Sequence, residues 1–191
     1  MILLDNSYFV GELSLPNIPV TSPEVQEISG VAAVLQAVGE KNLNWFGDKY
    51  VVDFLVHLFG WKLATKFLTE IQKPEPDEIW VDLKSHLLLE FGSVKKSPIA
   101  NYVYFWIMRD AMTKTTIAGE ADERFNNADN VNARRKFVKA WNDMVDMLGG
   151  FVSWYYQNTD TYREYADNDT MCNPLSMRED SIYYKINDCN L

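Results

Sequence analysis

The strongest constraint on the fold is a stripe of large apolar side chains that recurs at helical spacing toward the C-terminal third of the chain. A spacing of three and four residues places these side chains on one face of an α-helix of roughly 25 residues, weakened near its end by Gly149 and Gly150. One apolar face needs a partner surface along its whole length, which favours a helical bundle. The stripe consists of Phe137, Trp141, Met144, Val145, Leu148, Val152 and Tyr155.

A second helix is predicted after Ser97 and Pro98, because a serine followed by proline is typical of a helix start. The residues from Ile99 to Met108 are apolar on nearly every face of this helix. Such a helix must be surrounded by other elements, either from its own domain or from a neighbour. The sequence therefore predicts a mainly α protein, built as a small helical bundle.

Further helices are predicted from local start and stop signals. Ser22 and Pro23 start a helix that we expect to run to about residue 38 and to end at Gly39. Apolar residues continue at helical spacing from Asn44 to about residue 73, with a break at Gly60. Asp77 is a candidate N-cap for a helix that ends at residues 91–93.

The remaining segments predict two arms and one insertion. Residues 1–22 contain a strand-like stretch, 8–13, followed by Pro16 and Pro19, and are expected to form an extended N-terminal arm. Residues 23–159 form the bundle domain, with a Thr-rich loop or hairpin inserted at 113–132. Residues 160–191 are polar and are expected to form a C-terminal arm that a partner orders.

Charge and cysteine content exclude several classes of protein. The net charge of −9 argues against wrapping of duplex DNA. The acidity lies at the two ends, since residues 1–60 carry seven acidic and two basic side chains and residues 160–191 carry seven and three. Cys172 and Cys189 are too few for a disulfide framework. Met1–Leu4 lacks the pattern of a signal peptide, and no run approaches the roughly 20 apolar residues of a membrane-spanning helix, so a soluble protein is expected.

No motif for catalysis, cofactor binding or metal binding is recognised. The sequence lacks the patterns of phosphate-binding loops, dinucleotide folds, serine hydrolases, zinc proteases and EF-hands. His57 and His86 lie in apolar helical runs and are interpreted as packing or solvated histidines. Asp143 and Asp146 are interpreted as a solvated face of the long helix. We therefore expect a protein that is not an enzyme, with no cofactor or metal.

The features left over favour binding to other proteins. Arg134, Arg135 and Lys136, with Lys139, form a basic cluster at the start of the long helix, where cations oppose the helix dipole. The cluster is expected either to pair with an acidic arm of a neighbour or to be solvated, with binding to nucleic acid as a third alternative. Aromatic residues are abundant, and they either pack in the core or lie at protein interfaces, where they are enriched. The candidate interface residues are Tyr8, Phe9, Tyr102, Trp106, Thr115, Thr116, Arg134, Arg135, Lys136, Trp154 and Tyr155.

A family resemblance rests on four local phrases in order along residues 40–155. These are Asp53–Leu55 with Leu58–Gly60, then Ala64–Leu68, then Ser97–Trp106, then Thr115–Glu120. The chain resembles head–tail connector (adaptor) proteins of tailed bacteriophages, in particular the neck ring proteins of crAss-like phages of Bacteroidetes. The helix at 23–38 and the long C-terminal tail are additions to the smallest adaptors.

The resemblance implies a structural subunit of an oligomeric ring, commonly twelve-fold, in the virion. Such a ring would be assembled in the bacterial cytoplasm, would contact the portal protein and adjacent neck or tail rings, and would form part of the DNA conduit without sequence-specific binding. An acidic subunit suits a conduit, since it repels phosphate. One alternative is a small acidic helical regulator or inhibitor that binds one host protein. Another is an enzyme with an unrecognised carboxylate site.

Overall fold

The computed structural model describes residues 3–15, 31–116, 119–122, 130–166, 182 and 184–186. Side chains are described within these ranges except at residues 31–43, 46, 111–116, 119–122 and 130–134. Within the described part the protein is mainly helical, as the sequence predicts. No helix in these ranges is both long enough and apolar enough to span a membrane.

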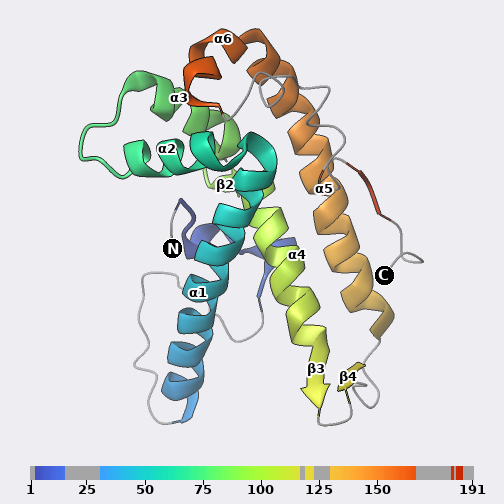
Figure 1. Ribbon diagram of the computed structural model, residues 1–191. Coiled ribbons are helices and arrows are strands. Elements are labelled where there is room, and N and C mark those ends of the chain that lie inside the picture. Colours follow the sequence, from blue (N-terminus) through green and yellow to red (C-terminus); the bar gives the residue numbers. More distant parts are fainter. Residues whose placement is uncertain are drawn as a thin grey trace.

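Three long helices run side by side and form the body of the fold (Figure 1). They are α1 (Val31–Phe59), α4 (Pro98–Met112) and α5 (Asn130–Gln157). Helix α4 packs against both α1 and α5. Its residues from Ile99 to Phe105 are all buried, which confirms the prediction of a surrounded helix. The predicted stripe on α5 also faces the core, with only Val145 partly buried.

Helix α1 ends at Gly60, where the sequence predicts a break. Gly60 has a φ of +77°, a left-handed conformation that favours glycine, and it lets the chain turn into α2 (Trp61–Ile71). The predicted end at Gly39 is wrong, because α1 continues through it. A single glycine inside a helix costs only about 1 kcal/mol relative to alanine, which is too little to end a long helix. Residues 23–30 of the predicted first helix lie outside the described part.

Short helices cover the end of the body that is opposite to the β3 and β4 strands (Figure 1). Helix α2 is followed in the chain by α3 (Glu78–Leu87). The later helix α6 (Thr159–Tyr162) and a 3₁₀ turn, η3 (Arg163–Tyr165), cover the same end. Asp77 occupies the predicted N-cap position of α3, but its side chain makes no capping hydrogen bond there. Helix α3 ends at Leu87, earlier than the predicted end at residues 91–93.

The residues after α3 form a β-hairpin that the sequence interpretation missed. Strands β1 (Leu89–Phe91) and β2 (Val94–Lys96) pair antiparallel, with Phe91 opposite Val94. Gly92 has a φ of +63°, which fits the first position of a two-residue type II′ turn. Phe91, Gly92 and Ser93 are therefore a strand end and a turn, not the end of a helix.

A second hairpin connects α4 to α5 and lies at one end of the body (Figure 1). Its strands are β3 (Thr113–Thr116) and β4 (Gly119–Asp122), paired antiparallel from Thr113 opposite Asp122. This confirms a hairpin within the predicted insertion at 113–132. The β-branched threonines of β3 favour a strand over continuation of the helix.

The two chain ends differ from the predicted arms where they are described. Residues 6–13 form two 3₁₀ turns, η1 (Asn6–Tyr8) and η2 (Gly11–Leu13), so the predicted strand at 8–13 is wrong. Leu4, Tyr8, Phe9 and Leu15 are buried in the core of the same chain. At the other end, Tyr162 and Ile182 are buried as well. These parts of both ends pack on the chain's own domain.

Aromatic side chains fill the core in two groups. One group lies at the covered end of the body and contains Phe59, Phe67, Trp80, Phe151, Tyr155 and Tyr162. The other lies between α1, α4 and α5 and contains Phe54, Tyr102, Phe105, Phe137 and Trp141. Most of the high aromatic content is therefore used for the packing of one domain.

Candidate interaction surfaces

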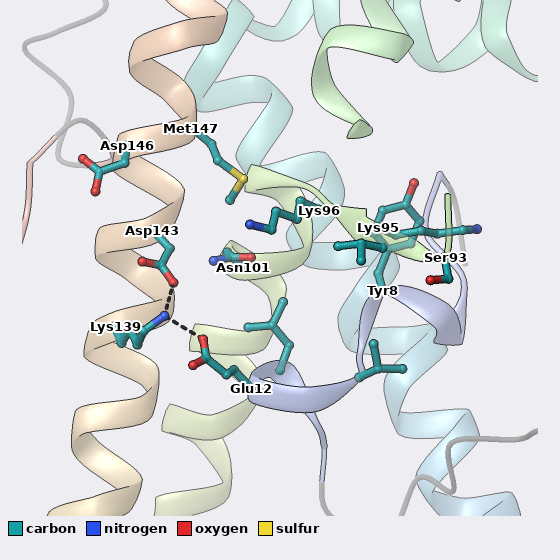
Figure 2. A pocket seen from close by; sticks show the side chains of 13 residues that line it. Tyr8, Glu12, Ser93, Lys95, Lys96, Asn101, Lys139, Asp143, Asp146 and Met147 are labelled. Carbon is teal, nitrogen blue, oxygen red and sulfur yellow. Dashed lines mark hydrogen bonds and ion pairs between the residues drawn. The ribbon is translucent and has the colours of Figure 1, made fainter. Parts of the chain in front are cut away.

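A groove of about 500 Å³ lies between the N-terminal turns, the β1–β2 hairpin, α4 and α5 (Figure 2). Apolar and charged side chains alternate along its wall. The groove lies within the size range of binding sites for small ligands and side chains. Its lining consists of Tyr8, Val10, Glu12, Leu13, Ser93, Val94, Lys95, Lys96, Asn101, Lys139, Asp143, Asp146 and Met147.

Three of the charged side chains that line the groove, Glu12, Lys139 and Asp143, are paired with one another. Lys139 Nζ lies 2.6 Å from Glu12 Oε2 and 2.8 Å from Asp143 Oδ2, so it ties the N-terminal segment to α5 (Figure 2). The hydrogen bonds to Asp143 and Glu12 raise the pKa of Lys139, and the bond from Lys139 lowers the pKa of Glu12. These groups stabilise each other and form no nucleophile–base pair.

A second charged contact holds the hairpin against the N-terminal turns. Lys95 Nζ lies 3.2 Å from Asp5 Oδ2 and 3.4 Å from Glu90 Oε1, and it sits 5.1 Å from the centre of the Tyr8 ring. The hydrogen bond to Asp5 raises the pKa of Lys95. The Tyr8 hydroxyl donates to Glu90 at 3.2 Å, and burial followed by this bond raises the pKa of Tyr8. The groove wall on this side is therefore fixed by the chain itself.

Apolar side chains are exposed beside the groove. The exposed fraction is 38% for Val10, 67% for Phe91 and 51% for Val94. Val10 and Val94 line the groove, and Phe91 is the cross-strand partner of Val94. We call Val10, Phe91 and Val94 the hairpin surface. Exposed apolar side chains that gather beside a groove are typical of a binding surface for another protein.

A different surface carries aromatic rings and cations on α1 and α4. Trp45 is 61% exposed, and Lys49 Nζ lies 5.7 Å from the centre of its ring and 4.7 Å from that of Tyr50. Tyr50 stacks on Trp106 at 5.6 Å, and the guanidinium of Arg109 lies 4.9 Å from the Trp106 ring. We call these five residues the Trp45 surface. Aromatic rings and arginine are the residue types enriched where proteins bind each other.

The two histidines, interpreted from the sequence as packing or solvated, each lie near the carboxylate of an aspartate one helical turn earlier. His57 Nε2 lies 3.8 Å from Asp53 Oδ1, and His86 Nδ1 lies 3.5 Å from Asp82 Oδ1. His86 also stacks on Trp154, with ring centres 3.8 Å apart. Among the described residues, no three His, Cys, Asp or Glu side chains cluster to hold a metal ion.

The structure places four candidate interface residues inside the chain's own core. Tyr8, Phe9, Tyr102 and Tyr155 are each at most 3% exposed. The Tyr102 hydroxyl donates to Asp53 Oδ2 at 2.6 Å, and its ring contacts Phe54. These side chains are not presented to a neighbour while the domain is folded, because their own domain already surrounds them.

The other candidates are partly or fully at the surface, or lie outside the described side chains. Trp106 and Trp154 are half-buried, and Arg135 and Lys136 are exposed. The Trp106 Nε1 atom is buried without a hydrogen-bond partner in the described part of the chain. Thr115 and Thr116 lie in β3 and Arg134 lies in α5, but their side chains are not described.

The exposed residues that define both surfaces were absent from the predicted set. Phe91 and Val94 flank Gly92 and Ser93, a pair that predicts a two-residue turn between strand-forming residues. Trp45 lies next to polar Asn44 at the predicted start of a helix, and Trp61 (65% exposed) directly follows a glycine break. No signal in the spacing separates these exposed tryptophans from buried ones.

Comparison with known protein families, with curated proteins and with solved structures finds no match for this chain.

Proposed function

We propose that this chain is a structural subunit of an oligomeric ring in the portal–neck–tail connector of a tailed bacteriophage, where it forms part of the DNA conduit between head and tail. One observation carries the proposal: apolar side chains are exposed on two separate surfaces, Val10, Phe91 and Val94 on one and Trp45 on the other, of a domain whose core is already filled by its own aromatic residues. Exposed apolar side chains of this kind are typical of surfaces that bind another protein.

Two different surfaces are what a ring subunit needs. In a closed ring each subunit contacts its neighbour through a head-to-tail interface, so one patch must fit a different patch on the next copy. The hairpin surface offers aliphatic and phenyl groups beside a groove, whereas the Trp45 surface offers a protruding indole with flanking cations. We propose that the hairpin surface of one copy receives the Trp45 surface of the next.

The phage connector is favoured by the resemblance of residues 40–155 and by the β3–β4 hairpin. The resemblance implies an inserted segment that reaches toward the channel, and this hairpin lies at one end of the body, between α4 and α5 (Figure 1). The net charge of −9 fits a channel wall that repels DNA phosphates. Contacts with the portal protein and adjacent rings, and a place in the virion, belong to the same proposal.

The test is native mass spectrometry and negative-stain imaging of the purified chain, alone and with its cognate portal protein. We expect closed rings. Phe91→Ser and Trp45→Ser should each weaken assembly, because burial of one large apolar side chain contributes about 1.5–3 kcal/mol per interface. Val81→Ser, on α3 and 46% exposed, is the matched control and should leave assembly unchanged.

Two outcomes would contradict the proposal. One is a chain that stays monomeric at micromolar concentration with and without the portal protein. The other is a stable one-to-one complex with a single host protein and no annular species, which is the result expected for a regulator or inhibitor.

A further inference from the structure

A short C-terminal segment lies along α5 (Figure 1). Three hydrogen bonds hold it. Trp141 Nε1 donates to the Tyr184 carbonyl oxygen at 2.8 Å, Asn142 Nδ2 donates to the Ile186 carbonyl oxygen at 3.0 Å, and Ile186 N donates to Asn142 Oδ1 at 2.9 Å. We call Trp141, Asn142 and Asp146 the α5 clasp.

The α5 clasp binds the main chain of the segment. The Asn142 amide both donates to and accepts from Ile186, as the backbone of a neighbouring β-strand would. Trp141 Nε1 binds the carbonyl oxygen of Tyr184, two residues before Ile186. The clasp therefore binds main-chain groups at two positions of the segment, and these contacts do not depend on which copy supplies the segment.

Side chains of the segment add to these bonds, and Ile186 packs, partly buried, against the core. Ile182 is 1% exposed and anchors the segment in the core, and Lys185 Nζ lies 2.8 Å from Asp146 Oδ1. Tyr184 is 58% exposed, so more than half of this residue is open to solvent. The contacts that hold the segment are non-covalent, and its release would expose Ile182 while the apolar stripe of α5 still faces the other helices.

We propose that the α5 clasp receives residues 182–186 of a second copy of this chain when the subunits assemble. Residues 167–181 connect Ala166 to the segment and, fully extended, span up to about 50 Å, enough to reach either the same α5 or that of an adjacent subunit. Exchange of an identical segment links subunits with contacts that the fold already contains. This inference rests on the proposed self-assembly and names the segment that locks it.

The exchange is tested by cross-linking between two differently tagged chains, both carrying Cys172→Ser and Cys189→Ser. One chain carries Asp146→Cys and the other carries Lys185→Cys, at two side chains that are 63% and 56% exposed. They are mixed under denaturing conditions, refolded together, sorted by native mass and treated with a short bismaleimide. The assembled fraction is expected to give a covalent heterodimer.

Three controls define the geometry. A single chain with both cysteines reports the contact within one copy. Gln157→Cys replaces Asp146→Cys in a matched pair, about 16 Å farther along α5, and should cross-link weakly. Asn142→Ala should lower the heterodimer yield several-fold, whereas Asn158→Ala should not, because Asn158 Nδ2 bonds to the Trp154 carbonyl oxygen of its own helix.

The outcomes distinguish the ring proposal from the proposed exchange of the C-terminal segment. Assembled rings without heterodimer, together with cross-linking inside the doubly substituted chain, would overturn the exchange and leave the ring proposal standing. A heterodimer found only in a two-copy species would support the exchange and contradict the ring. Absence of both an assembled species and a heterodimer would overturn both.

Discussion

The substitution Tyr102→Phe separates a core role from an interface role for this residue. It removes one hydroxyl and keeps the ring, which is 2% exposed and contacts Phe54 and Trp141. The lost bond joins the hydroxyl to Asp53 Oδ2 at 2.6 Å. Hydrogen bonds to charged groups contribute about 1.5–3 kcal/mol when both partners are buried. The Asp53 side chain is 45% exposed and water replaces the lost donor, so we expect a loss of about 1 kcal/mol.

A loss of this size lowers the midpoint of thermal unfolding by about 2–4 °C for a chain of this length. Urea denaturation should shift to a lower midpoint with an unchanged slope, since the exposed area of the unfolded state is the same. Tyr156→Phe, at a tyrosine that is 65% exposed, is the matched control and should change neither quantity.

A double-mutant cycle of Tyr102→Phe with Asp53→Asn should recover a coupling of about 1 kcal/mol between the two side chains. The assembly state should remain that of the unchanged chain. Unchanged stability of Tyr102→Phe would mean that the bond to Asp53 contributes nothing to folding. Loss of assembly at full stability would mean that the hydroxyl acts at an interface.

Two further predictions concern the pH dependence of folding. Burial raises the pKa of Tyr162 to about 12. The contribution of the buried phenol to stability is therefore complete below the ordinary tyrosine pKa near 10 and is lost as the pH rises toward 12. Tyr162→Phe should remove one late-ionising phenol from an absorbance titration and should reduce the loss of stability at alkaline pH. The hydrogen bond from Lys139 lowers the pKa of Glu12, so the stability that this contact contributes is present above the ordinary glutamate range and is lost as the pH falls through the lowered pKa. Glu12→Gln should therefore flatten the acid limb of the stability profile, and an unchanged limb would mean that the contact with Lys139 contributes no stability.

Local signals along the chain were sufficient to predict much of the fold. The serine–proline start of α4, the apolar stripe of α5 and the break at Gly60 all coincide with observed element boundaries or faces. Each of these signals acts within a few residues, and none depends on distant packing. The β-branched run at Thr113–Thr116 belongs to the same class, since it disfavours helix by its own side-chain sterics.

The errors in the predicted fold arise where tertiary packing overrides local preference. Gly39 weakens a helix by itself, but α1 is 29 residues long and continues through it. The prolines that follow Leu4, Tyr8 and Phe9 favour the prediction of an extended arm. In the structure these three side chains are buried in the core, and this packing holds the segment in 3₁₀ turns. A short hairpin such as β1–β2 is also hard to predict, because three-residue strands carry too few residues for a periodic pattern.

The candidate site residues were the hardest to predict, for a physical reason. Aromatic side chains stabilise cores and interfaces through the same burial and ring contacts, so composition does not separate the two. Tyr102 and Tyr155 are buried, whereas Trp45 and Trp61 are exposed, and all four occur in helical apolar patterns. A residue that binds the backbone of another segment, such as Asn142, is equally hard to predict, since a single asparagine on a helix forms no distinctive sequence pattern.

Helix α5 connects the two parts of the assembly proposal. Lys139, Asp143 and Met147 line the groove, whereas Asn142 and Asp146 hold the C-terminal segment. The groove residues and the clasp residues of α5 therefore lie within nine residues of one another. Asp146 takes part in both, because it lines the groove and binds Lys185. The apolar stripe of α5 fixes the position of the helix backbone. The groove and the clasp are therefore positioned by the same core packing. In the proposed assembly, both would be preformed before a neighbouring copy binds.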